Sequence, residues 1–160
     1  MNAAVYGLIG VIVGAAMSWL GSALNDRRKE RHEGRMLVRG EKLDAYASFS
    51  AATKEYMAVL YRVAAHRGVD DQTERLSLAK AEPLLSEAFQ ARDRAFEQIR
   101  IVGSDESIAR ARAWVKQIYE MRNYLWARRV VALEWAALRD RANETRDAFH
   151  EQVRQELAVA

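Results

Sequence analysis

Residues 3–24 contain no charged side chain, and this stretch constrains the fold more than any other feature of the chain. A helix rises about 1.5 Å per residue, so these residues would extend about 33 Å, enough for a hydrocarbon core of about 30 Å. A helix also satisfies its own backbone hydrogen bonds in lipid. Tyr6 and Trp19 lie near the two ends, where amphipathic rings favour the headgroup region. The sequence therefore predicts a transmembrane anchor over residues 1–24.

The charged residues that flank this stretch favour an uncleaved anchor over a signal peptide. A signal peptide has basic residues before its apolar segment and a small-residue cleavage site after it. Here the basic residues follow the apolar segment, and we expect them to lie at the membrane surface: Arg27, Arg28, Lys29, Arg31 and Arg35. The positive-inside rule then places the N-terminus outside and the remainder of the chain in the cytoplasm. We expect a single-pass protein of the plasma membrane.

The net charge of +3 is concentrated in a basic juxtamembrane segment, residues 25–42. This segment holds seven of the 25 Lys and Arg and four of the 22 Asp and Glu, which leaves 18 of each sign in residues 43–160. Glu30 and Glu33 are interleaved with the basic residues, as in a helix with intrahelical ion pairs. The segment is therefore expected to contact membrane lipid headgroups, and nucleic acid is not an expected partner.

Small residues recur along one face of the predicted span at steps of three and four. The predicted helix-packing residues are Gly7, Gly10, Gly14, Ser18 and Gly21. A stripe of small residues lets two helix backbones approach closely in lipid, which favours a homo-oligomer or docking on another membrane protein. The alternative is that Gly and Ala are simply frequent in membrane helices.

From residue 43 onward the chain follows a helical pattern. A first amphipathic helix is predicted over about residues 36–67, ending at Gly68. Asp70 and Asp71 are predicted to cap the next helix. The apolar face of the first helix is expected to contain Leu43, Tyr46, Ala47, Ser50, Thr53, Met57, Leu60 and Ala64.

The second predicted helix covers about residues 73–102 and contains Pro83. Proline is accepted in the first turn of a helix and kinks an interior, so either a short helix precedes one that starts near Pro83, or one helix bends there. Gly103 and Ser104 then mark the end of this helix and the start of the next. Gly103 is predicted to be a left-handed C-terminal cap, and Ser104 an N-cap.

Residues 105–160 contain neither Gly nor Pro, and their helical phase slips in the middle. A single helix of this length would be about 80 Å long, roughly twice its partners, so we predict a turn within residues 123–135. The fold class is therefore all-α: a transmembrane helix followed by an antiparallel three- to four-helix bundle over residues 43–160. The scarcity of Gly and Pro argues against β-sandwiches and doubly wound sheets.

Three short motifs resemble a group of small, uncharacterised bacterial helical proteins with an N-terminal membrane anchor. They are Tyr46-Ala47-x-Phe49, Ile101-Val102-Gly103-Ser104 and Phe149-x-x-x-Val153-Arg154-x-Glu156-Leu157. The resemblance implies a helical bundle with one anchor. It implies no activity, and no site residue is transferred from it.

The sequence predicts no catalytic, cofactor-binding or metal-binding residues. The absence of Cys excludes disulfides, a cysteine nucleophile and Cys-ligated metals. Asp147, His150 and Glu151 are close in sequence, but such groups are usually solvated helix pairs. Ser48, Ser50 and Thr53 have no His partner nearby in the sequence and are interpreted as packing residues. No small-molecule substrate is evident.

Aromatic and arginine side chains gather in the second half of the chain, where they form a candidate partner surface. This set comprises Trp114, Tyr124, Trp126, Arg128, Arg129 and Trp135. Trp, Tyr and Arg dominate interface hot spots, although the same aromatic residues could fill the bundle core. We expect a membrane-anchored, non-enzymatic module for self-association or partner recruitment. The alternative is a membrane-active, pore-forming or lysis-type protein that acts through its Gly-rich span.

Overall fold

The computed structural model of the chain describes residues 37–71 and 74–159. The chain divides into two compact units, residues 1–39 and 40–160, and the description below concerns the second. The predicted anchor over residues 1–24, its small-residue stripe and the five basic membrane-surface residues all lie outside the described residues. Within the described ranges, no helix has both the length and the apolar character to cross a membrane.

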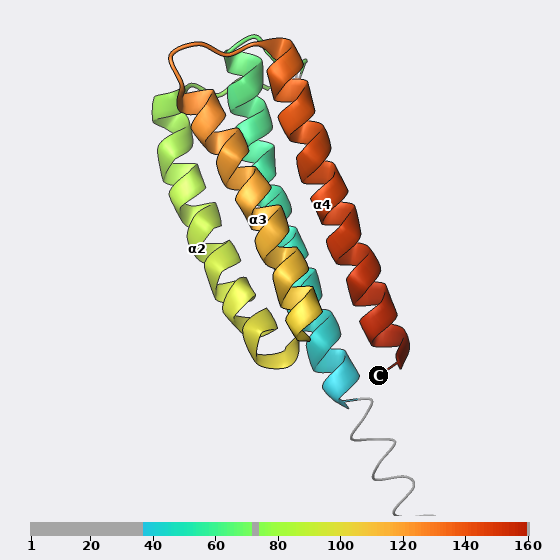
Figure 1. Cartoon of the computed structure of the whole chain (residues 1–160). Helices are drawn as coiled ribbons and strands as arrows, with labels where there is room; N and C mark the ends of the chain where they lie inside the picture. The colour runs from blue at the N-terminus through green and yellow to red at the C-terminus, as the bar shows by residue number, and fades with distance from the viewer. Residues whose placement is uncertain (1–36, 72–73, 160) are drawn as a thin grey trace, which may run out of the picture. The chain divides into compact units, whose positions relative to one another are not determined.

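The described residues form an all-helical bundle, which confirms the predicted helical fold (Figure 1). A first helix covers residues 37–66 and is followed by α2 (Leu78–Val102), α3 (Asp105–Trp126) and α4 (Ala132–Val159). Successive helices run in opposite directions, so the end of α4 returns to the level at which the first helix begins (Figure 1). The described residues contain no strand. Short connections and apolar stripes explain this up-down order.

The first helix ends as predicted at Gly68, whose φ of 73° lies in the left-handed region. The amide of Val69 donates to the carbonyl of Ala64, and the amide of Gly68 donates to that of Ala65. These paired bonds are the Schellman arrangement, which satisfies carbonyls at a helix end. Of the residues predicted for the apolar face, Ser50 is half-buried and the others that the structure buries are Tyr46, Thr53, Met57, Leu60 and Ala64. The assignment is wrong for Leu43, whose side chain is 53% exposed, and for Ala47, which is also exposed.

The second helix starts later than the sequence predicts. It begins at Leu78, and Ser77 occupies the N-cap position. The prediction that Asp70 and Asp71 cap this helix is therefore wrong, since both precede it by more than one turn. Asp70 instead accepts a hydrogen bond of 2.7 Å from the indole Nε1 of Trp135 on α4. The sequence left open whether Pro83 starts a helix or lies within one, and in the structure it lies within α2.

The turn between α2 and α3 requires Gly103 for a different reason from the one predicted. Its φ is −83°, so the predicted left-handed cap is wrong. A Cβ atom at this position would instead lie 2.8 Å from the carbonyl oxygen of Ile99 and 3.0 Å from the hydroxyl of Tyr46. A side chain at position 103 is therefore excluded by the lack of space and not by the backbone angle. Ser104 is an N-cap as predicted, because its hydroxyl accepts from the amide of Ser107.

The predicted turn within residues 123–135 is confirmed, because α3 ends at Trp126 and α4 begins at Ala132. The core between the helices is rich in aromatic rings. Phe49 of the first helix lies 5.7 Å from Trp114 of α3 and 5.3 Å from Phe149 of α4, in edge-to-face arrangements. All three side chains are fully buried. Such pairs add about 0.5–1.5 kcal/mol each beyond area burial, so they fix how three helices face one another.

Candidate functional site

The aromatic and arginine set predicted as a partner surface is divided by the structure. Trp114 and Trp135 are 0% and 1% exposed, and both belong to the core. Their assignment to a partner surface is therefore wrong. Both residues lie on the buried stripes of their helices, which turn them inward. Tyr124 and Trp126 are half-buried, whereas Arg128 and Arg129 are exposed.

The exposed arginines belong to the loop over residues 127–131, which side chains hold in place. The hydroxyl of Tyr124 donates to the carbonyl of Val131 and also accepts from its amide. A guanidinium nitrogen of Arg67, at the end of the first helix, donates to the carbonyl of Ala127 at 2.8 Å. We name residues 127–131 together with Leu133 the arginine loop. Leu133, in the first turn of α4, is 80% exposed.

A serine and a histidine that are distant in sequence meet across the bundle. The hydroxyl of Ser50 lies 3.2 Å from Nε2 of His150. Burial, aided by the positive charges of Lys54 and Arg146, lowers the pKa of His150 below its usual 6.5. Asp147, one helical turn before His150, accepts a hydrogen bond from Arg146 instead. The ring of Trp114 stands edge-on against the imidazole at 5.8 Å, so the pair belongs to the edge of the core.

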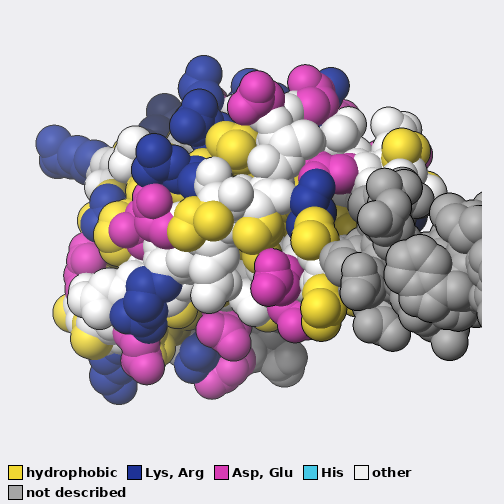
Figure 2. Space-filling view, turned by 90° about the horizontal axis from the view of Figure 1, so that it is seen from below, with side chains coloured by type: hydrophobic (Ala, Val, Ile, Leu, Met, Phe, Trp, Pro, Cys, Tyr) yellow, Lys and Arg dark blue, Asp and Glu magenta, His cyan; other side chains and the backbone are white. Residues whose placement is uncertain are grey.

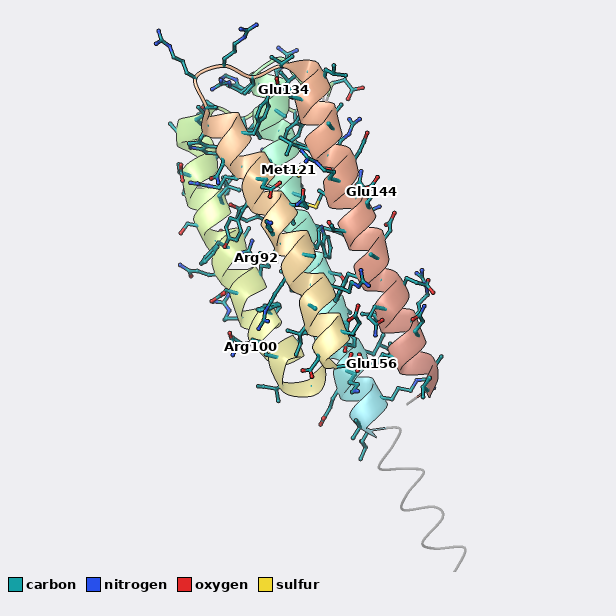
Figure 3. All side chains as sticks on the ribbon, in the orientation of Figure 1. Arg92, Arg100, Met121, Glu134, Glu144 and Glu156 are labelled. Atoms are coloured by element: carbon teal, nitrogen blue, oxygen red, sulfur yellow. The ribbon has the colours of Figure 1, made fainter. Side chains whose placement is uncertain are left out.

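The carboxylate of Glu156 ties three parts of the bundle together at its lower end (Figure 3). One oxygen accepts from Lys42 at 2.6 Å, and the other accepts from the hydroxyls of Tyr46, Ser104 and Ser107 at 2.8, 2.6 and 2.6 Å. Burial alone would raise the pKa of Glu156, but these donors outweigh it and lower that pKa to about 2. We name this group the Glu156 clasp. It fixes the start of the first helix, the α2–α3 turn and the end of α4.

Arg92 is the one arginine that the described residues bury, with 2% of its surface exposed. It lies on the buried stripe of α2, between Ala88 and Ala95, and faces α3 (Figure 3). One guanidinium nitrogen donates to the hydroxyl of Tyr119 at 2.7 Å. The guanidinium carbon also lies 4.9–5.3 Å from the ring centres of Tyr56, Phe89 and Tyr119.

The charge of Arg92 is not neutralised within the described part of the chain. None of the ion pairs between described residues includes it, and its Nη1 has no hydrogen-bond partner among those residues. Arginine does not deprotonate in proteins, and a buried unpaired charge is costly. Stacking on aromatic faces offsets part of that cost. An arginine within an otherwise apolar stripe is a signal visible in the sequence, and our sequence analysis missed it.

The surface has two hollows along α2 and α3, and Arg92 lines the larger one. A hollow of about 510 Å³ is lined by Arg92, Asp93, Phe96, Arg112, Val115, Lys116, Tyr119, Glu120 and Asn123. A second, of about 270 Å³, is lined by Tyr56, Glu82, Leu85, Ser86, Phe89, Tyr119 and Arg122. Tyr119 lines both. In the second hollow the cation is partnered, because Arg122 pairs with Glu82 and stacks on Trp126.

The lower end of the bundle carries mixed side chains. Figure 2, a view from below, shows acidic and basic side chains distributed over this end with hydrophobic side chains between them. Ile101 and Val159, near the last residues of α2 and α4, are 82% and 91% exposed. Within residues 37–71 and 74–159, no group of three or more His, Cys, Asp or Glu is placed to hold a metal ion.

No protein-family model, curated protein or solved structure matches the chain. The resemblance to anchored bacterial helical proteins therefore stays a prediction. What the chain does must be inferred from its own side chains.

Proposed function

We propose that the chain is a membrane-anchored, non-enzymatic helical module that recruits a partner protein at the cytoplasmic face of the membrane. The uncharged stretch over residues 3–24 and the basic residues after it support the anchor and its orientation. The stripe of small residues from Gly7 to Gly21 supports association of anchors, with a second copy or with another membrane protein. The helical bundle supplies the recruiting surface.

The observation that carries the proposal is the arginine loop. Arg128 and Arg129 are exposed on a backbone that Tyr124 and Arg67 hold with hydrogen bonds, and Leu133, four residues after Arg129, is 80% exposed. A preordered loop loses little conformational entropy when it binds. Two guanidinium groups beside an apolar side chain complement an acidic surface with an apolar contact. The partner should therefore present carboxylates around a small hydrophobic recess.

The Ser50–His150 pair favours a binding role over hydrolytic chemistry. A serine nucleophile needs a base that a third group orients and a place for the reacting atom. Here the nearby carboxylate of Asp147 is engaged by Arg146, and Trp114 packs on the imidazole. Neither Ser50 nor His150 lines the 510 Å³ hollow, which lies between α2 and α3.

Site-specific photocrosslinking in intact membranes tests the recruiting surface. A photoreactive residue replaces Leu133 in the full chain, and the matched control replaces Ile101, which is 82% exposed at the opposite end of the bundle. We expect a discrete protein adduct from position 133, lost in R128E/R129E and absent from position 101. Absence of an adduct from position 133, or the same adducts from both positions, contradicts the proposal.

Membrane attachment and self-association are tested separately. The full chain should stay with membranes after alkaline extraction, and a protease added to the cytoplasmic side should digest the bundle. Replacing Gly10 and Gly14 by Ile should reduce dimers trapped by lysine crosslinking in membranes, because the larger side chains separate the helices. Leakage of a dye from cells that express the chain would instead favour a pore-forming protein.

A further inference from the structure

We propose that the hollow beside Arg92 is a binding site for a small organic monocarboxylate with an apolar body. The site goes beyond the proposed recruitment of a protein. It lies between α2 and α3, and none of the residues that line it belongs to the arginine loop. The two proposals can therefore fail independently.

The first argument is the uncompensated charge. Arg92 carries a positive charge and is 2% exposed, and its Nη1 has no hydrogen-bond partner among the described residues. In a protein core, replacing buried charged residues by well-packed apolar residues of similar volume often leaves the stability unchanged or increases it. A cation retained between aromatic rings without a carboxylate is therefore poorly explained by stability. It is well placed to meet an anion supplied from outside.

The second argument is the shape and the lining of the hollow. Its volume of about 510 Å³ lies within the range of about 300–1,000 Å³ that is typical of small-molecule sites. Phe96, Val115 and Tyr119 supply apolar walls. The hollow is therefore suited to a compact apolar body that directs its charged group toward Arg92.

The third argument is the balance of charge, which selects one negative charge over two. The ionisable residues of the lining are the basic Arg92, Arg112 and Lys116 and the acidic Asp93 and Glu120, a formal excess of +1. A singly charged carboxylate neutralises that excess, and its two oxygens match the planar guanidinium fork. A dianion such as a phosphate monoester would meet the repulsion of Asp93 and Glu120.

Binding requires a small rearrangement, because Nη1 is enclosed and the guanidinium already donates to Tyr119. Rotation of the Tyr119 side chain, which lines both hollows, would open a path from the larger hollow to the guanidinium. Side-chain rotations of this kind are common when ligands bind. The displaced hydroxyl could then donate to the bound carboxylate.

The experiment is calorimetric titration of the full chain in phosphatidylcholine nanodiscs. The probe is 2-naphthylacetate, and the comparison compounds are the uncharged 2-naphthylacetamide and the dianionic 2-naphthyl phosphate. We expect saturable binding of one naphthylacetate per chain, with at least tenfold weaker binding of the other two. Absence of saturable binding, or equal affinity for the acetate and the amide, overturns the proposal. Tighter binding of the phosphate overturns the choice of a monocarboxylate.

Variants locate the site. Arg92→Met removes the charge and keeps much of the volume, so naphthylacetate binding should fall at least tenfold. The matched control is Arg122→Met at the neighbouring hollow, where the guanidinium already pairs with Glu82. The affinity of this variant for naphthylacetate should stay within twofold of that of the parent chain. Val115→Trp fills the hollow without changing any charge and should also abolish binding. Retained affinity in both Arg92→Met and Val115→Trp refutes the site.

Discussion

Replacing Glu156 by Gln should destabilise the bundle in a way that depends on pH. Five contacts from four residues converge on this carboxylate, whose side chain is 9% exposed. The pKa falls from 4.5 to about 2, since the donors outweigh the effect of burial, which alone would raise it. At about 1.36 kcal/mol per pKa unit, the ionised clasp contributes about 3 kcal/mol to the free energy of unfolding.

The pH dependence has a fixed sign. A carboxyl group whose pKa is lower in the folded state gives its full stabilisation above its unfolded value, here near 4.5. The contribution decreases as the pH falls from about 5 and is lost near pH 2. Glutamine resembles the protonated acid at every pH. The difference between parent and variant should therefore be about 3 kcal/mol at pH 7 and less than half of that at pH 3.

The assay is urea unfolding of the full chain in zwitterionic detergent, followed by tryptophan fluorescence at pH 7, 5, 4 and 3. Trp114 and Trp135 are buried, so their emission should report loss of the core. Glu144→Gln is the matched control, because Glu144 is exposed on the same helix (Figure 3). A cost below about 1 kcal/mol at pH 7, or an equal cost at pH 7 and pH 3, would refute the reasoning.

Further substitutions test other parts of the bundle. Gly103→Ala should lower the free energy of unfolding by about 1–3 kcal/mol, because the new Cβ would lie 2.8 Å from the carbonyl oxygen of Ile99. Gly40→Ala, where a Cβ meets nothing within 4 Å, should raise it by up to about 1 kcal/mol; the same sign for both substitutions would contradict this reasoning. Trp114→Ala should cost about 3–5 kcal/mol in urea unfolding, whereas a surface role predicts a small change. In an NMR titration His150 should protonate below pH 6.5, since burial lowers its pKa, and titration at or above 6.5 would contradict its burial.

Short-range patterns in the sequence predicted the helical class and several boundaries correctly. The helix end at Gly68, the N-cap at Ser104 and the break within residues 123–135 depend on backbone sterics and on hydrogen bonds between near neighbours. These forces act within a few residues, so the sequence displays them directly. The prediction for Gly103 failed for the opposite reason, because its close neighbour Tyr46 comes from another helix and local spacing does not reveal it.

Tertiary structure alone decided which charged and polar groups meet. Arg92 and Glu156 stand at core-facing positions, Arg92 four residues after Ala88 and Glu156 seven residues after Phe149, so helical spacing already marked them as unusual. Spacing did not show that Glu156 accepts from Lys42 and three hydroxyls, whereas Arg92 contacts three aromatic rings and, in the described part of the chain, has no acidic partner. Those outcomes depend on the rotation and register of each helix against its neighbours.

By itself, the sequence determined that this chain has an uncharged stretch long enough to span a bilayer, followed by a basic segment and charge-balanced amphipathic helices. Composition and periodicity suffice for that, because they reflect transfer of side chains from water and local backbone geometry. The structure decided that Trp114 is core, that Ser50 meets His150, and that Arg92 lies beside a hollow with no ion-pair partner among residues 37–71 and 74–159. Such pairings join residues far apart in the chain, and only packing of whole helices sets their distances.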